Sequence, residues 1–144
     1  MKKILIIAGL MLFGINAIAS NTEYTYSPTY IQHLKTCAKY TDEYTTAIQT
    51  GDETSPVLNI KSTEEILGWL NTKCITKSTT FSIDLGENIL VTKCALSRAQ
   101  VNSLVQKMKD VNQLGTKEAR KALQDEMTKM IEDEKTCKIK NYLE

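Results

Sequence analysis

The sequence predicts an α+β domain with an N-terminal helix, an antiparallel meander of about four strands, and a C-terminal antiparallel helical hairpin packed on one face of the sheet. Three observations support this fold. The middle of the chain alternates apolar with Thr and Ser residues and is interrupted by short turn signals, as strands of a meander are. After Leu96 the apolar residues recur every three or four positions, which is typical of helices. The four cysteines are an even number, which indicates two disulfides in an exported chain.

The first 19 residues have the pattern of a secretory signal peptide. Lys2 and Lys3 precede an apolar run, and Ala17-Ile18-Ala19 provides small residues around a cleavage site. The run is shorter than the roughly 20 apolar residues of a spanning helix, so cleavage is favoured over a retained anchor. We therefore expect residues 20–144 to form a single periplasmic or secreted domain, starting near Ser20, without stable insertion in a membrane.

The first expected element of this domain is a helix over about residues 28–39. Ser27 is a good N-cap, and Pro28 suits the first position of a helix. Ile31 and Leu34 follow at helical spacing.

Four strands are expected next. Tight connections at Asn71-Thr72 and Gly86-Glu87 join the last three into a meander. With these connections, Ile66, Ile75 and Phe81 fall on one face, which we expect the helices to cover. The expected strands are about residues 44–48, 64–70, 73–85 and 88–96.

The C-terminal hairpin is predicted from its caps and its apolar stripes. Ser97 and Gln100 form a capping-box pattern, and Gly115 ends the first helix. Thr116 can cap a second helix, in which the helical spacing of apolar residues continues to Cys137. The short break implies that the two helices are antiparallel.

This arrangement ranks the disulfide pairings. A hairpin brings the end of its second helix back to the start of its first, which places Cys137 near Cys94 and leaves Cys37 with Cys74. A pairing of Cys74 with Cys94 is disfavoured, because the expected meander places them on opposite faces. The wide spacing contains no C-x-x-C pair, which argues against a zinc site and a thioredoxin-like redox pair.

Charge gives no indication of a nucleic-acid partner. Without Lys2 and Lys3 the chain holds 16 basic and 17 acidic residues, so its net charge is close to zero. A near-neutral chain offers no overall attraction for nucleic acid or an anionic membrane. The sequence does not indicate an oligomeric state.

One pair of residues allows a catalytic interpretation. His33, the single histidine, stands four positions before Cys37, so the two can share a helix face as a Cys-His dyad. A small secreted hydrolase or thiol enzyme using Cys37 and His33 is therefore the alternative function. Cysteines of exported chains usually form disulfides, however. A catalytic pair of carboxylates is not indicated either, because the adjacent residues Glu64 and Glu65 point to opposite faces of a strand. No motif for a metal or a cofactor is present, so we predict neither, and no catalytic residue.

The tyrosines are the feature most open to a binding role. Tyrosine offers a large, rigid contact area with a polar tip, which suits recognition of protein or carbohydrate. The other interpretation is that Tyr30, Tyr40 and Tyr44 cover the edge of the core while Tyr24 and Tyr26 lie in a loose tail. We expect a non-catalytic exported binding protein of bacterial type, such as an inhibitor of an extracellular enzyme or a component of an envelope assembly. The candidate binding residues are Tyr24, Tyr26, Tyr30, Tyr44 and Trp69.

Overall fold

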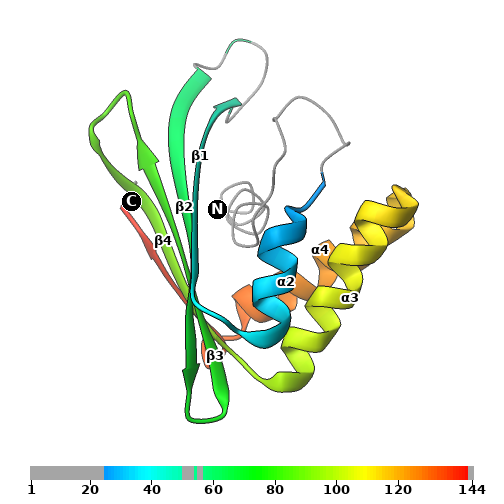
Figure 1. The fold of residues 1–144 in the computed structure, drawn as a ribbon. Coiled ribbons are helices and arrows are strands. Elements are labelled where there is room, and N and C mark those ends of the chain that lie inside the picture. The colour runs from blue at the N-terminus through cyan, green and yellow to red at the C-terminus, as the bar shows by residue number, and fades with distance from the viewer. Residues whose placement is uncertain (1–24, 50–53, 55–56, 143–144) are drawn as a thin grey trace.

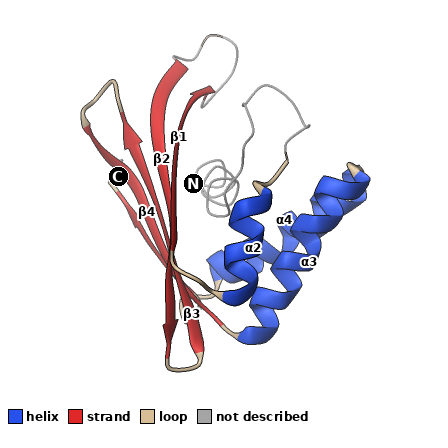
Figure 2. Ribbon diagram, in the orientation of Figure 1, coloured by secondary structure: helices blue, strands red, loops and turns tan. Residues whose placement is uncertain are grey.

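A five-stranded antiparallel sheet with three helices on one of its faces forms the fold (Figures 1 and 2). The computed structural model describes residues 25–49, 54 and 57–142, so the expected signal peptide and Tyr24 lie outside the described residues. We call the face of the sheet toward the helices the inner face and the opposite one the outer face. The elements are α2 (Pro28–Thr36), β1 (Tyr40–Gln49), β2 (Val57–Leu70), β3 (Lys73–Ser82), β4 (Glu87–Leu96), α3 (Arg98–Leu114), α4 (Lys117–Glu132) and β5 (Cys137–Asn141).

Helix α2 begins where the sequence predicts. The Ser27 side chain accepts a hydrogen bond from the backbone N–H of Tyr30, and Pro28 occupies the first turn. The helix ends at Thr36, because Cys37 adopts a left-handed conformation with φ of 52°. Its expected extension to residue 39 is therefore wrong, and the chain turns directly into β1.

The chain that enters α2 is attached to α3 by one side chain. The Asn112 Oδ1 accepts a hydrogen bond of 2.7 Å from the Tyr26 N–H, and its Nδ2 donates one of 2.9 Å to the Tyr26 carbonyl. These two bonds satisfy both backbone groups of Tyr26, as a neighbouring strand would.

The sheet is a meander in which each strand pairs with the next, and it has five strands where about four were expected. Two irregularities in pairing set its faces. Between Ile66 and Gly68 the register shifts, so that Ile66 pairs with Thr76 while Gly68 pairs with Ile75. A second shift occurs where Thr80 pairs with Leu90.

These shifts correct the expected faces. Ile66 is buried on the inner face, whereas Ile75 and Phe81 lie on the outer face and are half-buried. The extra residue of a bulge reverses the alternation of every side chain beyond it. Strand β3 consequently turns Thr76, Ser78 and other polar residues inward.

Both helices after the sheet have the predicted caps. The capping box between Ser97 and Gln100 is formed by hydrogen bonds in both directions, and Gly115 has a left-handed conformation with φ of 62°. Thr116 accepts a hydrogen bond from the Ala119 N–H at the start of α4. Helices α3 and α4 pack together and enclose an apolar core with α2 and the sheet.

The expected continuation of α4 to Cys137 is wrong. The helix ends at Glu132, and the Asp133 carboxylate accepts hydrogen bonds from the Thr136 hydroxyl and the Lys135 N–H. These bonds lower the pKa of Asp133, the Thr136 bond having the larger effect. They close a turn that leads into the fifth strand, with Cys137 as its first residue.

Both predicted disulfides are present. Cys37–Cys74 joins the end of α2 to β3, and Cys94–Cys137 joins β4 to β5. The reasons differ from those expected. Cys94 and Cys137 are direct cross-strand partners, not neighbours across a helical hairpin. Cys74 and Cys94 are both buried on the inner face, although they were placed on opposite faces.

Candidate functional site

A cluster of buried polar side chains lies on the inner face between β1 and β4. The register aligns Asp42, Glu64, Ser78 and Thr92 in one row across these four strands. Hydroxyl groups occupy most of the neighbouring inward positions, which is unusual for the buried face of a sheet. The buried polar residues of the three strands β2 to β4 are Ser62, Glu64, Thr76, Ser78, Thr80, Ser82 and Thr92.

Glu64 is the buried carboxyl of this cluster, with 1% of its surface exposed. The Ser78 hydroxyl donates a hydrogen bond of 2.8 Å to its Oε1. Burial raises the pKa of Glu64 well above its usual range, while hydrogen bonds from Ser78 and Tyr44 act in the opposite direction. The folded protein therefore favours the neutral carboxylic acid at this position.

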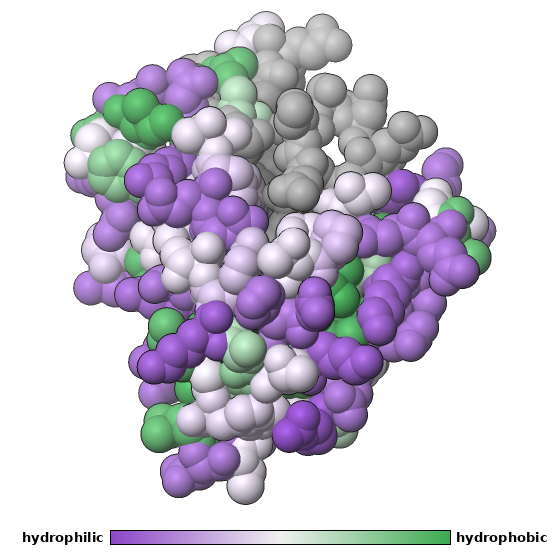
Figure 3. Space-filling view, viewed as in Figure 1, coloured by the Kyte–Doolittle hydropathy of each residue, from purple (hydrophilic) through white to green (hydrophobic). Residues whose placement is uncertain are grey.

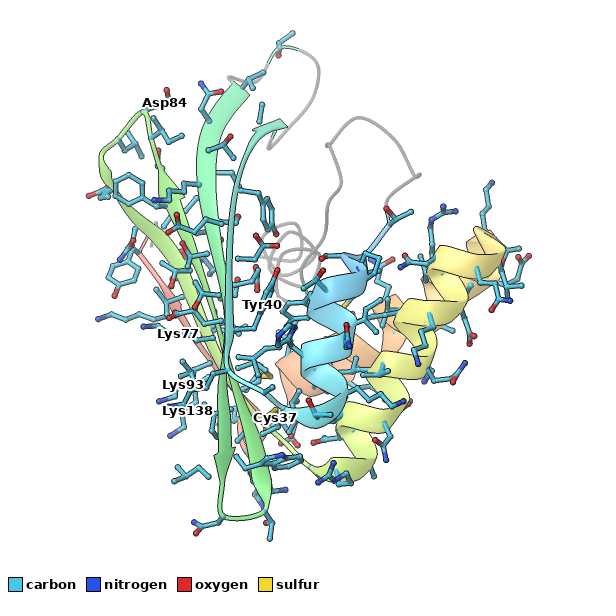
Figure 4. The ribbon with its side chains drawn as sticks, in the orientation of Figure 1. Cys37, Tyr40, Lys77, Asp84, Lys93 and Lys138 are labelled. Atoms are coloured by element: carbon cyan, nitrogen blue, oxygen red, sulfur yellow. A yellow bond between two sulfur atoms is a disulfide. The ribbon has the colours of Figure 1, made fainter. Side chains whose placement is uncertain are left out.

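Two tyrosines face this carboxyl from different elements. Burial raises the pKa of both Tyr30, on α2, and Tyr44, on β1, and the nearby Glu64 adds to the effect. Both side chains therefore remain neutral phenols, which donate hydrogen bonds and do not act as bases. The Tyr30 ring meets the edge of Tyr40 at 6.2 Å between centroids. Figure 4 shows Tyr40 on the helix side of β1.

His33 and Cys37 do not form the dyad of the alternative, catalytic interpretation. The His33 ring stacks on Tyr40 with centroids 4.5 Å apart, and its Nδ1 lies 2.8 Å from the Thr29 carbonyl oxygen, to which it donates. Cys37 is bonded to Cys74, so it has no thiol to act as a nucleophile. A thiol enzyme would first require reduction of that buried disulfide.

Metal ligands do not converge either. Among the residues that the structure describes, no group of three or more His, Cys, Asp or Glu side chains is placed to hold an ion. The described helices also include none long and apolar enough to cross a membrane.

The candidate binding residues have mostly structural positions. Tyr26 and Tyr30 are buried in the core, with 1% and 0% of their surfaces exposed. Trp69 is half-buried: its Nε1 donates to the Thr36 carbonyl oxygen, and Arg98 lies over its ring at 4.3 Å. Tyr44 is also half-buried, beside Glu64. Tyr30 agrees with the alternative interpretation, whereas Tyr26 is packed in the core and not in the loose tail that this interpretation expected.

The outer face carries a feature that the sequence reasoning missed. Lys77 pairs with Lys93, and Lys93 pairs with Lys138, so one lysine from each of β3, β4 and β5 stands in a line across the sheet. Figure 4 shows all three on the side away from the helices. We call these three residues the lysine row. Within the described chain none of them makes an ion pair.

Charge on the outer face of β3, β4 and β5 has one sign, and Glu65 of β2 lies opposite Lys77 at the boundary of this region. Strands β3 and β5 contain no acidic residue, and the one in β4, Glu87, pairs with Ser82, which is buried on the inner face. Lys140 lies over the Tyr142 ring at 4.7 Å, also on β5. The excess of lysine over acidic residues is visible in the sequences of β3, β4 and β5, but the near-neutral net charge of the whole chain conceals it.

Comparisons with known proteins add no assignment to these features. The sequence matches no protein-family model, and comparison with curated proteins and with solved structures finds no match.

Replacing Glu64 with Gln should stabilise the protein at neutral pH. Because its folded pKa is raised above the unfolded value of about 4.3, the wild type loses stability as pH rises through the interval between the two. Ionising the buried carboxyl costs stability that a neutral amide does not lose, so we expect Glu64→Gln to unfold at a clearly higher urea concentration than the wild type at pH 8. The gain should disappear near pH 3.5. Urea unfolding across this pH range measures it.

Glu65→Gln is the matched control, because Glu65 is adjacent in sequence but lies on the outer face. It should show no comparable pH-dependent gain. A Glu64→Gln effect that is independent of pH would contradict the assignment of Glu64 as a buried neutral acid.

Charge reversal at the centre of the lysine row should also stabilise the fold. Like charges directly opposite each other destabilise a sheet, and opposite charges stabilise it by about 0.2–1 kcal/mol per pair. Lys93→Glu should therefore increase the free energy of unfolding by about that amount at low salt, and Lys93→Gln by less. Salt should reduce both effects by screening. The measurement is denaturant unfolding. If Lys93→Glu is less stable than the wild type, the charges of Lys77 and Lys138 do not determine stability at this position.

Proposed function

We propose that this chain is a small periplasmic or secreted binding protein without catalytic activity, and that it recognises its partner with the outer face of the sheet. The single observation that carries the proposal is the lysine row: three cross-strand lysines that form no ion pair among the described residues, with one acidic residue, Glu65 of β2, opposite Lys77 at one end. Such an arrangement costs stability, and a bound partner of opposite charge offsets that cost.

The disulfides support the exported location. Bonds such as Cys37–Cys74 and Cys94–Cys137 form and persist in oxidising compartments. They agree with the signal-peptide pattern over residues 1–19, which is an inference from sequence.

The inner cluster supports binding over catalysis. Three of its titratable groups, Glu64, Tyr30 and Tyr44, favour their neutral forms, and all four cysteines of the chain are in disulfides. Catalysis needs a nucleophile, a base and a stabilising donor around one position, and this set offers no activated nucleophile. The cluster fits the role of a polar core that fixes the sheet beneath the outer face. An inhibitor of an extracellular enzyme and an envelope component both agree with such a scaffold.

Export predicts a mature chain that begins at or near Ser20. Intact-mass measurement of protein isolated from the periplasm or medium should give the mass of residues 20–144, less four hydrogens for two disulfides. Membrane-bound material that retains Met1 to Ala19 would instead establish an anchored form.

Binding through the outer face predicts how a captured partner responds to substitution. The folded protein, immobilised and exposed to its native medium or envelope extract, should retain a partner that Lys93→Glu loses and His33→Ala keeps. His33 lies on the helix side, so it serves as the control. Circular dichroism checks folding of each variant. Loss of the partner with His33→Ala, and retention with Lys93→Glu, would move the site to the inner side and contradict the proposal.

A further inference from the structure

We infer that the lysine row is a binding site for an acidic polysaccharide, a linear chain with carboxylates on its sugars. The inference rests on the proposed binding function and names the class of its ligand. It follows from the spacing of the charges, from the side chains around them, and from the chemistry of lysine.

The lysines form a regular array. Neighbouring strands lie about 4.8 Å apart, so Lys77, Lys93 and Lys138 span about 10 Å along a line perpendicular to the strands. The Debye length at physiological ionic strength is about 8 Å, so adjacent members act together on one anionic chain. A polymer that carries a carboxylate on each successive sugar presents charges in such a line, at a spacing comparable with one sugar ring.

Edge protection does not explain this array. Lysines on an edge strand discourage pairing with other sheets, and that accounts for Lys138 and Lys140 on β5. Lys93 and Lys77, however, lie on β4 and β3, which have neighbours on both sides, and only Lys77 has an acidic residue, Glu65 of β2, opposite it. Lys93 has a lysine opposite it on both neighbouring strands, so neither edge protection nor pairing with an opposite charge explains the charge at the centre of the row.

The surroundings of the row favour a sugar polymer over a bilayer. Hydroxyl groups of Thr63 and Thr79 occupy outer-face positions one step along the strands. In Figure 3, apolar residues on the strand side gather near its upper and lower ends. The exposed Leu67 and Leu70 lie near one end of the sheet, and Ile83 and Leu85 lie in the turn at the other. A bilayer that bound the apolar residues at either end of the sheet would not contact the middle of the lysine row at the same time.

The residue types also favour carboxylates over the phosphates of nucleic acid. The row contains no arginine, the side chain that binds phosphate through two parallel hydrogen bonds. Single-stranded nucleic acid also needs free aromatic rings on which to stack, and Lys140 already covers the Tyr142 ring. Lysine acts as a hydrated point charge, which suits a flexible polymer held by charge and hydroxyl contacts.

The test is binding of the folded exported chain to polygalacturonate, a linear carboxylate polymer, with neutral dextran as the control polymer. At 50 mM NaCl we expect binding to polygalacturonate alone, weakening as salt rises. Lys93→Glu should weaken binding by about tenfold or more, because it places a carboxylate in the middle of the row. Lys93→Arg, which keeps the charge, should retain most of the affinity.

Lys117→Glu is the matched control, since it makes the same change of charge at the start of α4, away from the sheet. It should change affinity by less than about twofold. A loss of binding by Lys93→Glu cannot be attributed to unfolding, because this variant is expected to be more stable than the wild type. A wild type that ignores polygalacturonate, or equal losses in Lys93→Glu and Lys117→Glu, overturns the inference.

Two further probes separate the class of polymer. Vesicles of phosphatidylglycerol or a single-stranded DNA oligonucleotide that bind as tightly as polygalacturonate also overturn the assignment to polysaccharide. These outcomes are distinct from failure of the proposed function, because the capture experiment can still yield a protein partner that depends on Lys93.

Discussion

The arrangement of this protein depends on the register between β2 and β3, which the bulge between Ile66 and Gly68 fixes. Gly68 has φ of 103°, a conformation that residues with a Cβ rarely adopt, so glycine is suited to this position. Successive strand residues point to opposite faces, so one extra residue exchanges the two faces for the rest of the strand. The bulge thereby buries Ile66 among the helices and directs Ser62 and Glu64 inward.

The same register decides where charge is exposed. With Thr76 and Ser78 turned inward, Lys77 must face outward, and its partners on β4 and β5 do the same. The inner polar cluster and the outer lysine row are therefore consequences of one pairing. A shift by one residue would bury the lysines and expose Glu64, at a large cost in free energy.

Local sequence signals predicted where the helices begin, but they could not predict pairing between strands that are distant in sequence. The caps at Ser27, Ser97 and Thr116 are formed within a few residues, so the sequence alone located the helix starts. The fifth strand was missed because Cys137 continues the helical spacing of α4, and only pairing with β4 determines its conformation. The disulfides were paired correctly because proximity of Cys94 and Cys137 follows from either arrangement. The candidate site could not be predicted in the same way. Two of the tyrosines clustered in sequence, Tyr26 and Tyr30, are packed in the apolar core, and the lysines that form a row in space are dispersed in sequence.

The attachment of Tyr26 to Asn112 has a consequence for how the protein can be handled and displayed. Because α3 holds Tyr26, the described part of the chain begins in the helical layer, on the side of the sheet opposite the lysines. At the other end, β5 passes directly beside the row, with Lys138 as its second residue. An N-terminal fusion partner or surface linkage therefore orients the strands outward and leaves them free, whereas one joined after Asn141 shields the charged strands.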